Sequence, residues 1–150
     1  MAITVGSRIF IDTNILVYAN LARSPFHNQA IARLREFENN ELDLYVSRQV
    51  LREYLAAMTR PGALTDEIPV SSLIQDVRGF ESSLIVFDDG PEVTAKLLET
   101  IEQNSVAGKQ IHDANIVATM LVHEIPALLT HNTDDFKRYK KIITVIPLVE

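Results

Sequence analysis

The segment Ile9-Phe10-Ile11-Asp12-Thr13-Asn14 points to the fold class, because a short apolar run ends there directly at three polar residues. Consecutive apolar residues over so short a length are typical of a strand buried on both faces of a sheet. Similar short runs follow at residues 44–46, 84–87, 127–129 and 142–146. We therefore expect five short strands.

Longer segments with apolar residues at helical spacing separate these runs. Ser24 and Pro25 are favourable residues for a helix start, and they precede such a segment that extends to residue 37. Ser47 is a candidate cap for a helix that ends before residues 60–62. Further helices are expected over residues 70–80, 93–101 and 111–124, the last apolar on most sides and therefore buried.

This alternation predicts an α/β protein in which one domain, residues 1–150, contains a central five-stranded parallel sheet flanked by helices on both faces. In such sheets, binding sites lie beyond the carboxyl ends of the strands, where the strand order reverses. The residues that directly follow each strand are therefore the candidates for a functional site.

Composition excludes several classes of protein. The chain has 150 residues, 14 Lys and Arg against 20 Asp and Glu, a net charge of −6 and no cysteine. Disulfide scaffolds, cysteine–zinc sites and thiol catalysis are excluded, and the acidic balance argues against nucleic-acid binding by surface charge alone. Without a recognisable signal peptide or an apolar run of about 18 residues, we expect a cytoplasmic protein that does not enter a membrane.

Three acidic positions are candidates for chemistry, although each also has a structural interpretation. Asp12 follows the first strand, where it serves equally well as a helix cap. Asp113 lies in the first turn of the apolar helix, where the helix dipole favours a carboxylate. Glu53 lies outside the apolar stripe of its helix, so that the pattern alone predicts a surface residue.

Other common site motifs are missing from the sequence. The first strand is not followed by a glycine-rich phosphate loop, the chain has no G-x-S-x-G segment, and the four histidines form no metal-binding pair at helical spacing. Scattered carboxylate and amide oxygens remain, and such hard ligands suit Mg²⁺ or Mn²⁺.

Three segments resemble motifs of one known family. Residues 10–19 are similar to the opening signature of PIN-domain nucleases, residues 111–118 resemble their third acidic motif, and residues 129–136 resemble their last one. The spacing of these motifs and the chain length are similar to those of the VapC-type toxins of bacterial type II toxin–antitoxin systems.

The resemblance implies a PIN-like nuclease domain that acts as a Mg²⁺-dependent endoribonuclease, with Mn²⁺ as a substitute. It also implies a pocket of four acids that serve both as catalytic residues and as metal ligands: Asp12, Glu53, Asp113 and Asp135. For Glu53, this implication replaces the surface interpretation. Many relatives have an acid two residues after the threonine, where this chain has Asn132. We assign the fourth position to Asp135 in preference to Asp134, with Asn132 as the remaining alternative.

The resemblance also implies an RNA substrate, a small cognate antitoxin and a homodimer. Four residues near the motifs are predicted to contact the substrate: Asn14, Arg48, Arg52 and Lys109. Basic residues after Asp135, at positions 137, 138, 140 and 141, are further candidates for phosphate contacts. The lack of an aromatic-rich RNA-binding motif favours recognition of the backbone over base stacking.

Two alternative functions share an acidic α/β edge. An α/β phosphoryl-transfer enzyme or receiver domain would carry further residues, namely an acid two residues after Asp12 in the enzyme or a lysine after the fifth strand in the receiver. Asn14 and the Ile146-Pro147 pair stand at those places. A non-catalytic binding module, in which the acids only cap helices, predicts that replacing Asp12 and Asp113 by asparagine leaves function intact.

Overall fold

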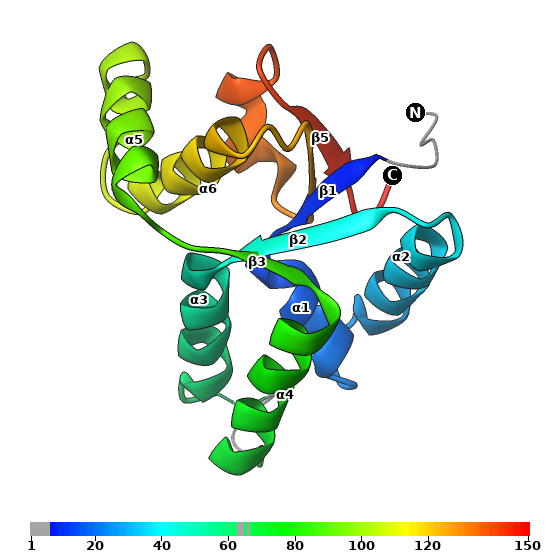
Figure 1. The fold of residues 1–150 in the computed structure, drawn as a ribbon. Helices are drawn as coiled ribbons and strands as arrows, with labels where there is room; N and C mark the ends of the chain where they lie inside the picture. Colours follow the sequence, from blue (N-terminus) through cyan, green and yellow to red (C-terminus); the bar gives the residue numbers. More distant parts are fainter. Residues whose placement is uncertain (1–6, 63–64, 66) are drawn as a thin grey trace.

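A parallel sheet of five strands forms the middle of the molecule (Figure 1). The computed structural model describes residues 7–62, 65 and 67–150. The strands lie in the order β3-β2-β1-β4-β5, and all four neighbouring pairs are parallel. The predicted fold class is confirmed, with strands β1 Arg8–Ile11, β2 Asp43–Ser47, β3 Ile85–Phe87, β4 Ala127–Thr130 and β5 Thr144–Pro147.

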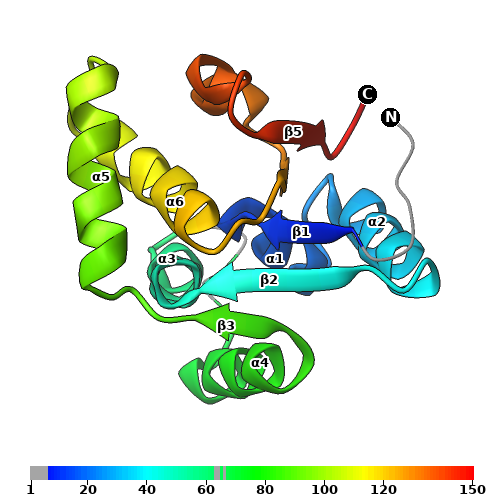
Figure 2. The same ribbon diagram turned by 45° about the horizontal axis from the view of Figure 1, so that its top comes forward.

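Helices cover both faces of this sheet (Figures 1 and 2). One group, in which α1 contacts α2 and α3, and α3 contacts α4, consists of α1 Thr13–Asn20, α2 His27–Asn39, α3 Arg48–Thr59 and α4 Val70–Ser83. The other group, in which α6 contacts both neighbours, consists of α5 Pro91–Gln103, α6 Gln110–Val122 and the 3₁₀ helix η1 Thr133–Tyr139. Among the described helices, none has the length and apolar character needed to cross a bilayer.

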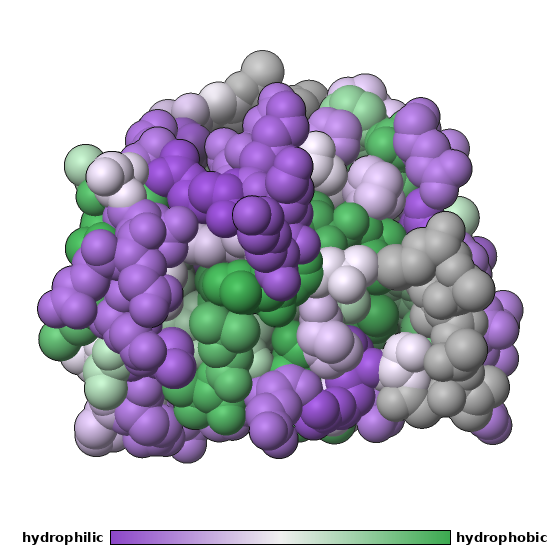
Figure 3. Space-filling view, turned by 90° about the horizontal axis from the view of Figure 1, so that it is seen from above, coloured by the Kyte–Doolittle hydropathy of each residue, from purple (hydrophilic) through white to green (hydrophobic). Residues whose placement is uncertain are grey.

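The core lies between the sheet and these two helix layers. Residues 9–11 of β1 are at most 1% exposed, as expected for a strand covered on both faces. Five consecutive residues of α6, from Ile116 to Met120, are also buried, which confirms the prediction made from its nearly continuous apolar surface. Seen from above, polar side chains cover most of the outer surface around a smaller apolar area (Figure 3).

Several predicted boundaries differ from the observed ones by one to three residues, and local hydrogen bonds explain two of these differences. Helix α2 begins at His27, because the Ser24 hydroxyl accepts a hydrogen bond from the Phe26 backbone N–H and holds a turn there. Strand β5 begins at Thr144, because the backbone N–H groups of Ile142 and Ile143 donate to the Tyr139 carbonyl and close the end of η1. Ser47 does precede α3, but its hydroxyl makes no capping hydrogen bond.

The strand order reverses at β1, which lies between β2 and β4. Ile11 is aligned with Leu129 across the β1–β4 pair, and the backbone N–H of Asp12 donates to the Leu129 carbonyl at 3.0 Å. The first residues after β1 and β4 therefore lie side by side at the carboxyl edge, which is where a site is expected in an open parallel sheet.

Candidate active site

Asp12 is both a helix cap and a buried carboxylate at this edge. Its Oδ1 accepts from the Thr13 backbone N–H at 2.8 Å, so that it caps α1. Its Oδ2 accepts from the Thr130 hydroxyl at 2.7 Å and from the Asn14 amide at 3.2 Å. The residue is only 7% exposed. Because these three donors fix both carboxylate oxygens, Asp12 has one defined orientation.

Asn14 joins the loop after β4 to the start of α1. Its Nδ2 also lies 3.2 Å from the Thr130 hydroxyl, and its Oδ1 accepts from the His131 backbone N–H at 3.0 Å. The Thr130 hydroxyl accepts in addition from the Asn132 backbone N–H at 3.1 Å. Asn14 lines the pocket, but its polar atoms form hydrogen bonds with protein groups and hold the Asp12 carboxylate and the loop after β4 in place.

Glu53 reaches the same pocket from the middle of α3. Its Oε2 accepts from the Thr13 hydroxyl at 2.9 Å, and its Oε1 accepts from the Gln49 amide at 3.0 Å. Gln49 is 5% exposed, and its amide also donates to the His112 carbonyl at 2.8 Å and accepts from Asn115 at 2.7 Å. The pattern-based surface interpretation of Glu53 is therefore wrong: a buried glutamine holds this half-buried carboxylate beside α1 and α6.

Two further carboxylates approach from the other helix layer. Asp113 lies half-buried in the first turn of α6, and Asp135 lies exposed in the first turn of η1. Both line a pocket of about 600 Å³ together with Asp12 and Glu53. Within the part of the chain that the structure describes, no hydrogen-bond donor reaches the Asp113 carboxylate. All four predicted acids thus face one pocket.

Asp134 and Asp135 have opposite surroundings, although they are neighbours in the sequence. The Asp134 side chain is 81% exposed and pairs with Lys137 at 2.7 Å, on the surface of η1. Asp134 does not line the pocket, whereas Asp135 and Asn132 do. This geometry favours Asp135 as the fourth carboxylate, with Asn132 close enough to add an amide.

Burial and crowding disfavour the charged forms of two of these acids. Burial raises the pKa of Asp12 to about 6, against the hydrogen bonds from Thr130 and Thr13 and with a contribution from the Glu53 charge. The pKa of Asp113 is raised to about 7, first by burial and then by the charges of Asp135, Asp12 and Glu53. Burial first, and repulsion between the carboxylates second, therefore favour a proton or a cation in the pocket.

The donor set fits a small hard cation. A carboxylate offers about four acceptor positions, of which the hydrogen bonds of Asp12 use three and those of Glu53 use two. Among residues 7–62, 65 and 67–150, no three acidic or histidine side chains converge into a ready-made cage. Mg²⁺ keeps several of its waters when it binds protein, so Asp12 and Asp113 would suffice as direct ligands.

The predicted basic contacts divide into two groups. Lys109 lines the pocket, and so does Arg60, which no motif in the sequence indicated. Arg48 instead pairs with Glu81 and Asp88, and Arg52 pairs with Asp89 at 3.6 Å. Neither Arg48 nor Arg52 lines the pocket. The acids that hold them follow β3 or lie on α4, so no local pattern around either arginine indicated this pairing.

The comparison with known families identifies the family of the domain. The PIN domain family model matches residues 9–142, and the chain therefore belongs to the PIN domain family. That match covers all three motifs and, apart from Arg8, strands β1 to β4. The resemblance of the three motifs to PIN-domain nucleases is thereby confirmed.

The relatives point to one branch of this family. The chain is 25% identical over 136 residues to ribonuclease VapC48 of Mycobacterium tuberculosis, covering 87% of this chain and 91% of the relative. Among solved structures, the sarcin–ricin-loop-cleaving toxin VapC20 of Mycobacterium tuberculosis superposes with a TM-score of 0.69 at 16% identity, covering 93% and 99% of the two chains. VapBC2 of Rickettsia felis, bound to a promoter DNA fragment, gives 0.66 at 20% identity, covering 93% and 98%.

Proposed function

We propose that the protein is a Mg²⁺-dependent endoribonuclease and the toxin of a type II toxin–antitoxin system. The observation that carries this proposal is the convergence of Asp12, Glu53, Asp113 and Asp135 on one pocket from four separate segments. The pKa values of Asp12 and Asp113 are raised by burial and, to a lesser degree, by neighbouring carboxylates, which supports a pocket that favours a bound cation. The similarity to a ribonuclease of the VapC group supports RNA as the substrate.

Asp12 and Asp113 would hold the metal ion directly, while Glu53 and Asp135 would bind its water ligands or a second ion. When bound, Mg²⁺ polarises the scissile phosphate and lowers the pKa of the attacking water. Mn²⁺, with its similar preference for oxygen ligands, would substitute for it.

Other residues of the chain orient these carboxylates. Thr130 and Asn14 fix the Asp12 carboxylate, so that its remaining lone pair has one direction. Thr13 and Gln49 do the same for Glu53. Lys109 and Arg60 place positive charge at the wall of the pocket, where they would bind phosphates on either side of the cut. The pocket thereby combines a site for a cation with a site for the RNA backbone.

The partners are proposed from the neighbouring structures, several of which contain a toxin with its antitoxin. We propose a short antitoxin that covers the acidic pocket, and a homodimer of the toxin. Exposed apolar side chains on α4, Val70 at 60% and Ile74 at 43%, are available for protein contacts. Light scattering of the purified chain should give the mass of a dimer, and a monomer mass at every concentration would contradict the homodimer.

The experiment that tests the proposed activity is RNA cleavage with Mg²⁺ and with a chelator. The wild-type protein should cut RNA internally with Mg²⁺ and lose this activity with the chelator. Asp113→Asn should lose at least 100-fold in rate, because it removes a proposed direct ligand. Asp43→Asn is the control, since Asp43 is an exposed acid at the start of β2, outside the pocket. Equal cleavage in all samples would support a non-catalytic binding module.

A further inference from the structure

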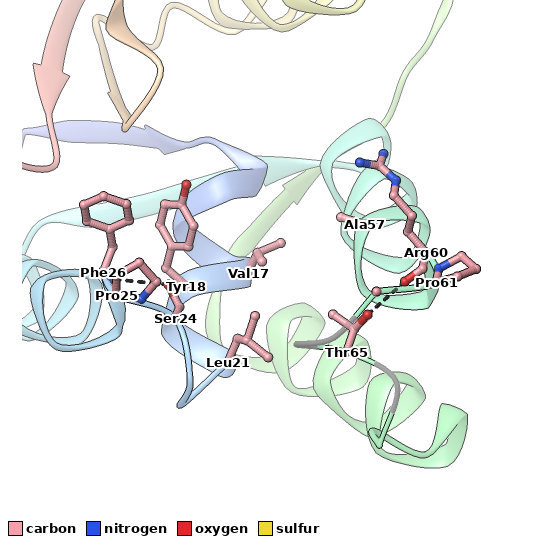
Figure 4. A pocket seen from close by; sticks show the side chains of 11 residues that line it. Val17, Tyr18, Leu21, Ser24, Pro25, Phe26, Ala57, Arg60, Pro61 and Thr65 are labelled. Atoms are coloured by element: carbon pink, nitrogen blue, oxygen red, sulfur yellow. Dashed lines mark hydrogen bonds between the residues drawn. The ribbon is translucent and has the colours of Figure 1, made fainter.

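An apolar cavity of about 440 Å³ lies directly beside the acidic pocket. Its walls come from α1, from residues 24–26 and from the end of α3 with the turn that follows (Figure 4). The cavity and the acidic pocket share four lining residues, namely Val17, Tyr18, Ala57 and Arg60. A group in the cavity would therefore be adjacent to a phosphate held in the acidic pocket.

Aromatic rings form one side of this cavity. Tyr18 and Phe26 line it, with ring centroids 5.2 Å apart. The His131 ring, which does not line the cavity, lies 4.2 Å from the Phe26 ring and edge-on to Tyr18 at 5.5 Å. His27 Nδ1 lies 2.8 Å from the Tyr18 carbonyl oxygen and ties α2 to α1. Tyr18 and Phe26 thus form an aromatic wall of the cavity, and the His131 ring packs against both of them.

The polar groups of the cavity wall are mostly bound to the protein itself. The Ser24 hydroxyl accepts from the Phe26 backbone, and the Thr65 hydroxyl donates to the Arg60 carbonyl at 2.8 Å. Arg60 is different, because within the described residues no carboxylate pairs with its guanidinium. Figure 4 shows the Arg60 side chain across the cavity from Tyr18 and Phe26. The cavity therefore offers apolar and aromatic surface with one cationic group at its border.

We propose that this cavity, which we call the base subsite, binds the nucleobase of a nucleotide adjacent to the phosphate that is cut. The inference rests on the proposed nuclease function and adds a specificity element to it. A base has a flat aromatic face that can stack on one of the Tyr18 and Phe26 rings, which are tilted by 49° to each other, and its attached phosphate has the charge that matches Arg60. The continuity of the two pockets favours one nucleotide that occupies both, and a protein segment in the cavity is the competing occupant.

The test uses short single-stranded RNA substrates in which the base on either side of the cut is replaced by an abasic residue. At one of the two positions, the abasic substrate should be cleaved with a kcat/KM at least 10-fold below that of the intact RNA. Phe26→Leu, which keeps an apolar side chain but removes the ring, should bring the ratio of intact to abasic cleavage close to one. Phe26→Tyr, which keeps the ring, should retain the ratio. Leu98→Ala on exposed α5 is the control.

Cleavage of both abasic substrates within twofold of the intact RNA would overturn the base subsite while leaving the nuclease proposal standing. A ratio of intact to abasic cleavage that is unchanged in Phe26→Leu would also overturn the base subsite. Absence of Mg²⁺-dependent cleavage of any RNA would instead contradict the proposed function. In that case, the binding of nucleoside monophosphates to the cavity tests the base subsite. Adenosine and cytidine monophosphates should shift the aromatic proton resonances of Tyr18 and Phe26, whereas ribose 5-phosphate should not. Equal or absent shifts would favour a protein segment as the occupant and overturn the proposal.

Discussion

The Thr130 hydroxyl donates a 2.7 Å hydrogen bond to the Asp12 carboxylate, although 118 positions separate the two residues in the sequence. The bond exists because β1 and β4 are neighbours in the sheet and each ends at the same edge. It supplies a neutral donor to a buried charge, whose Oδ2 atom otherwise accepts only the longer hydrogen bond of 3.2 Å from the Asn14 amide. The way the strands are ordered therefore sets the electrostatics of the pocket.

Thr130→Val should destabilise the protein in a pH-dependent manner. Valine has a similar shape but removes the shortest hydrogen bond of the Asp12 carboxylate, and a hydrogen bond to a charged group contributes about 1.5–3 kcal/mol. The cost should be larger at pH 8 than at pH 5, because the pKa of Asp12 is about 6 and the carboxyl is neutral at the lower pH. Urea unfolding of the wild type and the variant at both pH values measures this loss in the free energy of unfolding.

Thr100→Val is the matched control, because Thr100 is equally buried but its hydroxyl only donates to the Lys96 carbonyl within α5. Its cost should be the same at pH 5 and pH 8. A pH-independent cost for Thr130→Val as well would contradict the account of Asp12.

Asp113→Asn should stabilise the protein at pH 8 in the presence of a chelator. The pKa of Asp113 is raised from 3.8 to about 7 in the folded state, so between these values the folded protein binds more protons than the unfolded chain. The free energy of unfolding therefore falls as pH rises through this window, and Asp113 is destabilising above pH 7. Asparagine removes this penalty, which is about 1–2 kcal/mol after allowance for solvent screening of a half-exposed group.

Thermal unfolding of the Asp113→Asn variant from pH 4 to pH 8 checks this prediction, and the pH slope should be shallower than in the wild type. Asp134→Asn serves as the reference, since Asp134 is exposed and outside the pocket. A variant no more stable than the wild type at pH 8 would show that the pocket does not destabilise the charged form of Asp113.

Gln49→Met should lower RNA cleavage while leaving the fold intact. Gln49 binds Glu53, His112 and Asn115 at once, so its loss frees the Glu53 carboxylate to rotate out of position. Groups that orient metal ligands are typically worth 10- to 100-fold in activity. The comparison is with Gln75→Met, at an exposed position of α4. Cleavage within twofold of the wild type for both variants would remove Gln49 from the list of positioning residues.

Lys109→Ala and Arg52→Ala should differ in their effect on RNA binding. Lys109 lines the pocket, whereas Arg52 pairs with Asp89 outside it. Lys109→Ala should raise KM and reduce the slope of log KM against log salt by about 0.7, as expected for one lost contact to a single-stranded phosphate. Arg52→Ala should change neither. The reverse result would restore the sequence-based assignment of Arg52.

The sequence was sufficient for the elements that depend on local pattern. All five strands, the buried helix α6 and the positions of Asp12 and Asp113 follow from apolar runs and from what stands directly after them. Boundaries were less predictable, because Ser24 forms a turn in place of a cap, and that depends on one side-chain hydrogen bond.

The rest of the site depends on contacts between distant segments. Glu53 is indistinguishable by pattern from a surface glutamate until Gln49 and Thr13 are seen to hold it, and only the family resemblance indicated its role. Arg48 carries a charge that suits RNA, but its guanidinium forms an ion pair with Glu81 of α4. Tyr18, Phe26 and His131 lie on three segments, so no aromatic motif is visible in the sequence.

The most direct measurement of the central claim, that the pocket and not general surface acidity carries catalysis, is the Mg²⁺-dependent RNA cleavage rate of two neighbouring variants. Asp135→Asn removes a carboxylate that lines the pocket, and Asp134→Asn removes one that pairs with Lys137 on the surface. We expect Asp135→Asn to lose at least 10-fold in rate and Asp134→Asn to remain within twofold of the wild type. Equal rates for the two variants, or a greater loss for Asp134→Asn, would contradict the account.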